Sequence, residues 1–169
     1  LLNKIGLNSL PVKSSDDLKQ SDGLIIPGGE STTLSLLMKK YDLRESIIKF
    51  SKHNPVLGTC AGLILMSKDV DDERVDPLGL LELSVSRNAY GRQIHSSKKR
   101  VCFRHNQAKK IEFDSTFIRA PKIKYMGKNI NIVAKHENMP VAIFANNLLG
   151  LSFHPEIDGI DIFHKMMFD

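Results

Sequence analysis

Cysteine is scarce in this sequence, and long apolar runs are absent. Its 169 residues include only two cysteines, Cys60 and Cys102, so no disulfide framework is expected. The longest apolar stretches, such as 148–153, are as long as a strand and fall short of the ~20 residues that a membrane span needs. The first residues carry neither the basic region nor the small-residue cleavage site of a secretory signal. These absences favour a cytoplasmic protein without a membrane segment.

The overall composition is that of an ordinary globular protein. Apolar residues make up 41% of the chain and charged residues 25%, which excludes wholesale disorder. At roughly 100–200 residues per domain, the length predicts one domain over residues 1–169.

Acidic residues are missing from one stretch, Ser96–Lys110, which holds six lysines and arginines. Without those six cations the chain has 18 Lys and Arg against 19 Asp and Glu, so this stretch accounts for the net charge of +5. We interpret it as a solvated basic loop, and an anionic partner or substrate is the alternative. Because the usual DNA- and RNA-binding motifs are also absent, no nucleic-acid partner is expected.

Short apolar runs alternate with segments of helical period along the chain. This pattern predicts an α/β domain of three layers with a mainly parallel sheet. After Ser31, apolar residues at i, i+3, i+4 and i+7 from Leu34 predict a helix. Strands are expected at 24–26, 55–59, 80–85, 116–120, 130–135, 141–145 and 148–153, further helices at 43–51, 61–68 and the last twelve or so residues, and a loop at 69–76.

The strongest local signal is Gly58-Thr59-Cys60-Ala61-Gly62, between an expected strand and an expected helix. Small residues on both sides of Cys60 suit a strained turn that presents a nucleophile above the edge of a sheet. The start of a helix also favours a thiolate. In the alternative interpretation, Cys60 is a small buried apolar residue in a glycine-rich turn.

A cysteine nucleophile needs a base and a group that orients the base. His154-Pro155-Glu156 supplies both at the end of an expected strand, because residues i and i+2 of extended chain point the same way. Taken alone, this tripeptide is equally typical of an exposed strand end. Together with Cys60, at the strand ends where α/β folds build their sites, it predicts a catalytic triad.

Pro27-Gly28-Gly29-Glu30-Ser31 follows the first expected strand. Adjacent glycines allow backbone N–H groups to approach and reorient around a ligand, which suits an oxyanion hole. A phosphate cradle is the competing interpretation, but neither phosphate-binding glycine motif is present, and Glu30 would repel a phosphate. The spacing of cysteines and histidines matches no metal site.

Cys60 followed by a distant His154-x-Glu156 resembles the class I (triad) glutamine amidotransferases. From about Asp22 onward, the motifs PGGEST, GTCAGLIL, SRNAYGRQ, FIRAP and SFHPE occur in the order found in one family, the glutaminase subunits of pyridoxal 5′-phosphate synthase. The resemblance implies the flavodoxin-like fold of class I glutamine amidotransferases. The motifs that distinguish this family from the other glutaminases are Arg87-Asn88 with Gly91-Arg92-Gln93, and Ile118-Arg119-Ala120-Pro121.

The resemblance also implies a role for each matching residue. Cys60 attacks the side-chain amide of L-glutamine, His154 transfers protons, and Glu156 orients His154. The positions that match the family's glutamine-binding residues are Gly29, Glu30, Ser31, Arg87, Ile118 and Arg119, and the positions that match its oxyanion hole are Gly28, Gly29 and Ala61.

The resemblance implies hydrolysis of L-glutamine, with the ammonia passed to a synthase subunit that makes pyridoxal 5′-phosphate. No cofactor is expected, since pyridoxal phosphate is the product of that complex. The sequence departs from the family at its start, where the opening strand is missing and the domain is expected to be incomplete. Two alternatives therefore remain: a non-catalytic remnant that binds the synthase, and another cysteine-dependent amidase or peptidase. Measuring glutamine turnover, with and without the synthase, distinguishes the glutaminase from the non-catalytic remnant.

Overall fold

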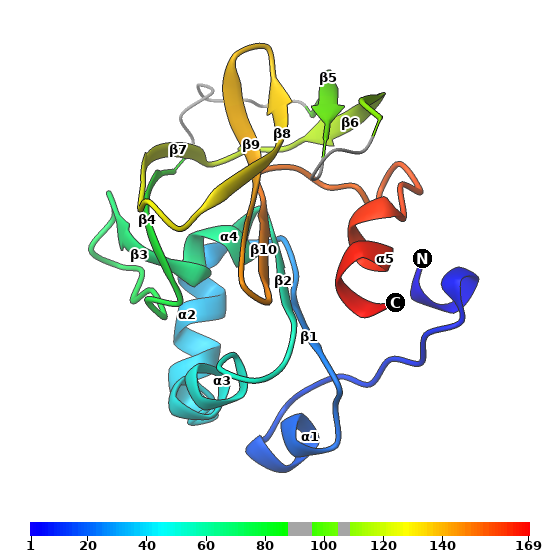
Figure 1. The fold of residues 1–169 in the computed structure, drawn as a ribbon. Helices are drawn as coiled ribbons and strands as arrows, with labels where there is room; N and C mark the ends of the chain where they lie inside the picture. The colour runs from blue at the N-terminus through cyan, green and yellow to red at the C-terminus, as the bar shows by residue number, and fades with distance from the viewer. Residues whose placement is uncertain (88–95, 105–108) are drawn as a thin grey trace.

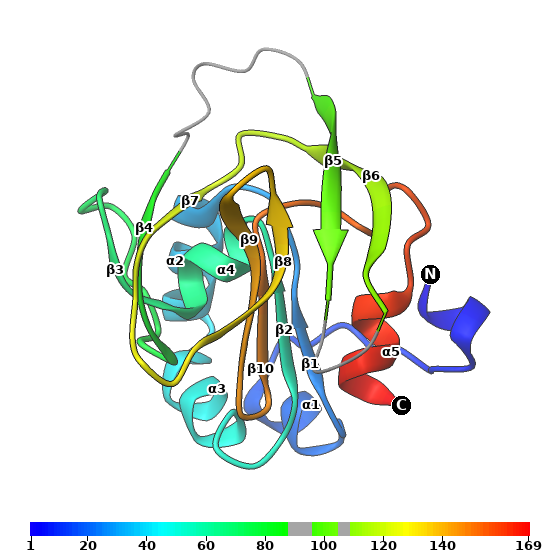
Figure 2. The same cartoon turned by 45° about the horizontal axis from the view of Figure 1, so that its top comes forward.

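Seven strands form one sheet in the order β1-β2-β10-β9-β8-β5-β6, with helices on both of its faces (Figures 1 and 2). The computed structural model describes residues 1–87, 96–104 and 109–169. The strands of this sheet are β1 (Leu24–Ile26), β2 (Val56–Thr59), β5 (Ser97–Phe103), β6 (Ile111–Phe117), β8 (Asn131–His136), β9 (Met139–Ala145) and β10 (Leu148–Leu151). A smaller sheet has the order β3-β4-β7 and contains β3 (Ser67–Val70), β4 (Leu81–Ser86) and β7 (Lys122–Met126).

The helices are short. They are the 3₁₀ helix η1 (Leu2–Ile5) and the α-helices α1 (Ser15–Lys19), α2 (Ser31–Lys40), α3 (Arg44–Phe50), α4 (Ala61–Met66) and α5 (Ile162–Phe168). None of the described helices is long and apolar enough to cross a bilayer.

Parallel pairing is concentrated at one end of the large sheet. β2 pairs in parallel with both β1 and β10, whereas the strands beyond β10 run antiparallel to their neighbours. The predicted α/β class is confirmed, and the sheet is mixed, with its parallel part at β1-β2-β10. Because parallel strands end at the same edge, these three bring the chain that follows each of them to one place.

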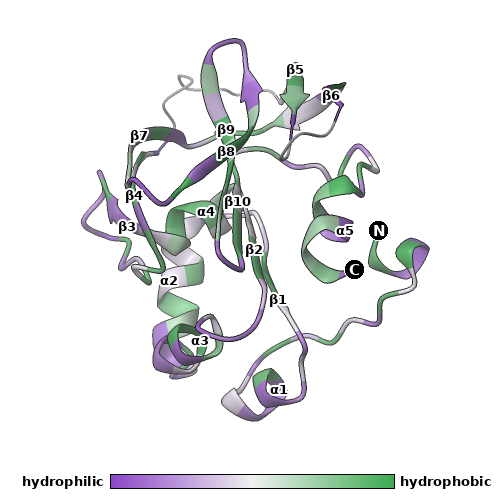
Figure 3. Cartoon of the chain, viewed as in Figure 1, coloured by the Kyte–Doolittle hydropathy of each residue, from purple (hydrophilic) through white to green (hydrophobic). Residues whose placement is uncertain are grey.

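Two apolar cores lie on opposite faces of the sheet, as the three-layer prediction requires. Alternate residues of a strand point to opposite faces, and in β2 Val56 belongs to one core while Leu57 belongs to the other. The Val56 side also holds α4, whose six residues are all buried and which is apolar along its length (Figure 3). The Leu57 side is closed by α5, where Phe163 packs edge-on against Phe103.

Two glycines let α4 approach the parallel strands closely. A Cβ atom on Gly62 would lie 2.0 Å from the carbonyl oxygen of Ile26, and one on Gly58 would lie 2.5 Å from the sulfur of Met66. Any larger residue at either position must push α4 away from β1 and β2. The glycines of the GTCAG motif are therefore packing requirements of the strand–helix junction.

The expected strands are present except at 116–120. The prediction of a strand there is correct only as far as Phe117, where β6 ends. The strand cannot continue through Arg119, because this residue has a φ of 45°. The interpretation of Ser96–Lys110 as a loop is wrong for its first half, which forms β5. Lys98 and Arg100 are exposed in this strand and Lys99 between them is half-buried, so β5 pairs with β6 while its cations stay at least partly accessible. Strands β3 and β7 were not predicted, and β3 begins within the expected helix 61–68.

We predict that Gly62→Ala destabilises the fold, because the new methyl group would overlap the Ile26 carbonyl. Overpacking of this kind costs about 1–3 kcal/mol in free energy of unfolding, measurable by denaturant titration. Lys49→Ala, on an exposed position of α3, is the control and is expected to unfold like the parent chain. An unchanged midpoint for Gly62→Ala would show that α4 has room to move.

Candidate active site

The segments that follow β1, β2 and β10 meet at the carboxyl edge of the parallel strands. β1 leads into Gly28 and Gly29, β2 into Cys60, and β10 into His154. A Cβ atom on Gly28 would lie 2.1 Å from Cε1 of the His154 imidazole, so the glycine turn lies directly against that ring. Glycine is thus required at Gly28 because the imidazole occupies the space of a side chain.

Cys60 adopts a backbone conformation that L-residues rarely take, with φ 50° and ψ −100°. It is the residue immediately before α4, its N–H donates to the carbonyl oxygen of Leu151 at 2.7 Å, and its side chain is buried. Strained non-glycine residues at a strand-to-helix turn are characteristic of nucleophile elbows. The structure therefore has the turn that the sequence predicts at Cys60, and Ala61 begins the helix.

His154 and Glu156 form the predicted pair. The imidazole Nδ1 lies 2.8 Å from Oε1 of Glu156, and the ring is largely buried. Burial acts to lower the pKa of His154, but hydrogen bonding and charge interactions with the Cys60 and Glu156 side chains outweigh it and raise the pKa to about 9. At neutral pH the imidazole is therefore protonated, and it interacts with the cysteine sulfur on one side and the carboxylate on the other.

The segment after β6 passes over the cysteine. The carbonyl oxygen of Ile118 lies 3.5 Å from the Cys60 sulfur, and the Ile118 and Arg119 side chains are exposed. Arg119 has a positive φ of 45°, which turns the chain at this point. The structure thus brings the two predicted residues to the mouth of the site beside Cys60.

Gly29, Glu30 and Ser31 form the junction between β1 and α2. Gly29 has a φ of 140°, and apart from its chain neighbours no described atom lies within 4 Å of the position of a Cβ, so the space beside its Cα is open. The Glu30 carboxylate accepts hydrogen bonds from the Thr32 and Thr33 hydroxyls, which lower its pKa. The Ser31 hydroxyl is buried and has no hydrogen-bond partner among the described residues.

Arg87 is held by two acids that the sequence analysis assigned to a loop. Its guanidinium is paired with the Asp72 carboxylate, and its N–H donates to Asp71 at 2.8 Å. Hydrogen bonds from Arg74 are the main cause of the lowered pKa of Asp72, and the charge of Arg87 adds to them. The charge of Arg87 also contributes to the lowered pKa of Glu30, after the hydrogen bonds from Thr32 and Thr33. A carboxyl partner for Arg87 had no local sequence signal, because the two residues are 15 positions apart.

The remaining motif residues, Asn88 and Gly91-Arg92-Gln93, lie outside the described residues. The described part of the chain contains no group of three or more His, Cys, Asp or Glu side chains arranged to hold a metal ion.

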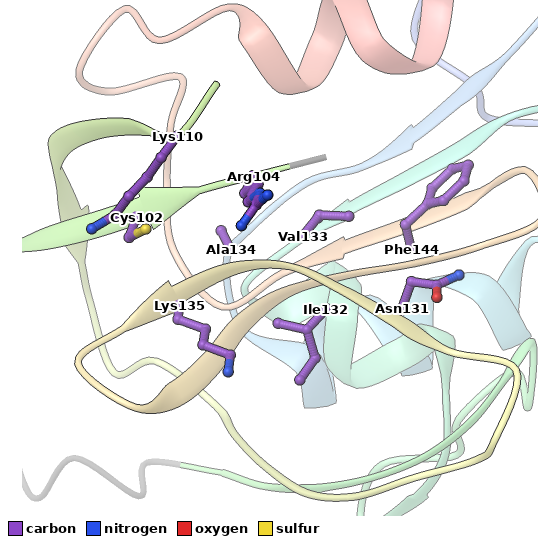
Figure 4. Close-up of a pocket in the computed structure, with 9 residues that line it drawn as sticks. All are labelled: Cys102, Arg104, Lys110, Asn131, Ile132, Val133, Ala134, Lys135 and Phe144. Atoms are coloured by element: carbon purple, nitrogen blue, oxygen red, sulfur yellow. The ribbon is translucent and has the colours of Figure 1, made fainter. Parts of the chain in front are cut away.

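A cavity of about 610 Å³ lies elsewhere, between β5, β8 and β9 (Figure 4). Arg104, Lys110 and Lys135 are among its lining residues, and none of the predicted site residues is. Three cations of the basic stretch form ion pairs: Lys98 with Asp158, Arg100 with Asp114, and Lys110 with Glu112. Much of the positive charge that raises the net charge is thus neutralised locally.

The comparisons with known proteins agree with this geometry. Residues 1–168 match the model of the SNO glutamine amidotransferase family. A pyridoxal 5′-phosphate synthase subunit PdxT from Thermoplasma volcanium is 43% identical over 95% of this chain and 78% of its own length. The subunit of the same name from Thermosipho africanus is 42% identical over 93% of this chain and 82% of its own length.

Solved structures agree as well. A crystal structure of a glutamine amidotransferase has a TM-score of 0.89 and 31% identity, covering 98% of this chain and 87% of the other. The family match, which spans nearly the whole chain, and the relatives above 40% identity together show that this protein belongs to the SNO glutamine amidotransferase family.

Proposed function

We propose that this chain hydrolyses L-glutamine to L-glutamate and ammonia, and that the ammonia passes to a synthase subunit that makes pyridoxal 5′-phosphate. The observation that carries the proposal is the strained Cys60 beside the His154–Glu156 pair. The relatives' description as subunits of pyridoxal 5′-phosphate synthase supports the destination of the ammonia.

Cys60 is the nucleophile in this proposal. His154, which is protonated at neutral pH, holds the proton that the Cys60 thiol gives up, and the sulfur attacks the side-chain amide carbon of glutamine. The oxygen of the resulting tetrahedral intermediate accepts hydrogen bonds from backbone N–H groups at the Gly28-Gly29 turn and at Ala61, at the start of α4. The open space beside Gly29 supports this role, since a substrate oxygen can approach its peptide.

His154 then acts as the acid. The imidazolium donates its proton to the departing nitrogen, ammonia leaves, and a γ-glutamyl thioester remains on Cys60. Water attacks the thioester after giving a proton to His154, the sulfur leaves as thiolate, and glutamate is released. Glu156 keeps the imidazole oriented through both steps, as its 2.8 Å contact with Nδ1 supports.

Recognition of free glutamine needs groups for its α-carboxylate and α-ammonium. We assign the carboxylate to the arginines, Arg87 and Arg119, and the ammonium to Glu30, whose carboxylate is ionised at neutral pH. Ser31 supports this assignment because its buried hydroxyl has no partner among the described residues, and a substrate amide or carboxylate could satisfy it. Ile118 forms part of the wall over the sulfur.

We place the reaction in the cytoplasm. A nucleophilic cysteine must stay reduced, and Cys60 and Cys102 are both free thiols in the structure. Ammonia released into water at neutral pH is mostly protonated and no longer nucleophilic, which favours transfer within a complex with the synthase subunit.

Cys60→Ala is expected to abolish glutamine hydrolysis while glutamine still binds, because the variant loses the attacking atom and keeps the recognition groups. Glutamate release and calorimetric binding of glutamine measure the two effects separately. Cys102→Ser, which alters the other cysteine at a half-buried position of β5, is the matched control and should keep the parent rate. Turnover by Cys60→Ala would exclude this mechanism.

Glu156→Gln is expected to lower kcat by at least ~10-fold and to shift the alkaline limb of kcat/KM to lower pH. The imidazolium must hold its proton for the leaving ammonia, so activity falls as pH rises through the pKa of His154, about 9 in the parent chain. Removing the carboxylate removes a group that raises this pKa, and the limb moves toward 6.5. Glu45→Gln, on an exposed position of α3, is the control; equal pH profiles in the two variants would contradict the role of Glu156.

Glutamine hydrolysis is expected to rise at least ~10-fold when the cognate synthase subunit is added. Gly28-Gly29 is a peptide without side chains, so docking nearby can favour the orientation in which its N–H meets the oxyanion. One such donor is worth ~10²–10³ in rate, which leaves room for this increase. Glutamate release is measured with and without the synthase, with Cys60→Ala as the blank, and equal rates would exclude gating by the partner.

A further inference from the structure

The turn that follows His154 is anchored by a carboxylate outside the predicted motifs. The Asp158 side chain is only 6% exposed. Its Oδ2 accepts the backbone N–H of Thr116 at 2.6 Å and the hydroxyl of Ser115 at 3.2 Å, and its Oδ1 accepts the Thr116 hydroxyl at 3.1 Å. One buried carboxylate thus binds two successive residues of β6.

Lys98 of β5 completes the surroundings of Asp158. Its ammonium lies 2.9 Å from Oδ1 and is itself 68% exposed. Burial acts to raise the pKa of Asp158, but hydrogen bonds from Lys98 and Thr116 outweigh it and hold the pKa below its usual value. The group is therefore an ionised acceptor at neutral pH, and its bonds to Thr116 are charge-assisted.

Thr116 connects Asp158 to both halves of the site. The N–H of His154 donates to the Thr116 carbonyl oxygen at 2.9 Å, in an isolated antiparallel bridge. Two residues further along the same strand end, the Ile118 carbonyl lies 3.5 Å from the Cys60 sulfur. A displacement of Thr116 therefore moves the base and the wall over the nucleophile together.

Glu156 depends on the same turn. Its side chain is 37% exposed, so burial alone does not fix its position against His154. The turn closes through hydrogen bonds from the N–H groups of Asp158 and Ile160 to the Pro155 carbonyl, at 3.2 and 2.9 Å. Because Asp158 is tied to β6 by its side chain and to Pro155 by its backbone, it limits where the Glu156 carboxylate can lie.

We propose that Asp158 is a positioning residue for the glutaminase reaction: its carboxylate clamps Thr116 and thereby aligns His154 between Cys60 and Glu156. The role in turnover rests on the proposed function, whereas the alignment of His154 does not. Asp158 contacts none of the reacting atoms, so it acts only through Thr116 and the turn. The Lys98 ion pair is an accessory, because the lysine side chain is exposed and binds Oδ1, whereas the Thr116 N–H binds Oδ2.

Asp158→Ala removes the acceptors and tests the clamp. We expect kcat to fall at least ~10-fold with a smaller change in KM for glutamine, since small misplacements of catalytic groups are costly and Asp158 does not hold Glu30 or Arg87, which still recognise the substrate. Titration of the His154 ring by NMR should show its pKa falling from about 9 toward 6.5, as the ring loses alignment with Cys60 and Glu156. The alkaline limb of kcat/KM should move to lower pH in parallel.

Two further variants separate the clamp from the ion pair and from general stability. Asp158→Asn keeps an oxygen for the Thr116 N–H and should restore most of the lost kcat and of the His154 pKa. Lys98→Met leaves all bonds between Asp158 and β6 in place and should keep the parent kcat and titration. If Asp158→Ala does not fold, Asp158→Glu replaces it: it keeps the charge, displaces the carboxylate by one methylene, and should change both readouts in the same direction.

Parent values of kcat and of the His154 pKa in folded Asp158→Ala, or in Asp158→Glu where that variant is needed, would overturn the proposal. An effect of Lys98→Met as large as that of Asp158→Ala would also overturn it, because the ion pair rather than Thr116 would then hold the site. If the parent chain does not hydrolyse glutamine at all, the proposed function fails, and the His154 titration still decides whether Asp158 aligns the ring.

Discussion

The site depends on the close approach of α4 to the parallel strands β1 and β2. Gly62 lies so near the Ile26 carbonyl that only a hydrogen fits between the helix and the strand. This contact fixes the start of α4, and the start of α4 forces Cys60 into its strained conformation at the end of β2. With β10 paired on the other side of β2, His154 is delivered to the same edge. If α4 lay further from the strands by the size of one methyl group, Cys60 would no longer be held in a fixed position relative to His154.

Local signals explain why the centre of the site could be predicted from the sequence. The strained turn at Cys60 and the i, i+2 pairing of His154 with Glu156 depend on residues adjacent in the chain, so the motifs determine their geometry. The paired glycines were assigned to an oxyanion hole, and the structure adds a second constraint on Gly28, the imidazole packed against it. That contact joins segments far apart in sequence and has no local signature.

The features that sequence reasoning missed are long-range. Strand β5 was taken for a loop because its cations suggested solvation, yet Lys98 and Arg100 are exposed in a strand that buries Val101 and Phe103. The partners of Arg87, which are Asp71 and Asp72, were placed in an acidic loop, and nothing nearby indicated that they hold an arginine predicted to bind glutamine. Pairing between side chains that are distant in the sequence depends on the register of several strands. Neither the secondary-structure propensity of the residues nor the period of the apolar positions determines that register.

Two kinds of interaction thus support the site, one local in the sequence and one long-range. Motifs within single turns place Cys60, His154 and Glu156, while contacts across the fold hold those turns against one another. The clearest such contact is made by the buried Asp158, two residues beyond Glu156, which binds Thr116 of β6 and also meets Lys98 from the most basic stretch. The basic stretch, whose composition suggested only a solvated surface, therefore contacts the Asp158 carboxylate through Lys98. The same carboxylate binds Thr116 and so connects the turn after His154 to β6. The register of β5 on β6 sets Lys98 opposite Thr116, which brings its exposed ammonium to Asp158 as an accessory to the bond between Asp158 and Thr116.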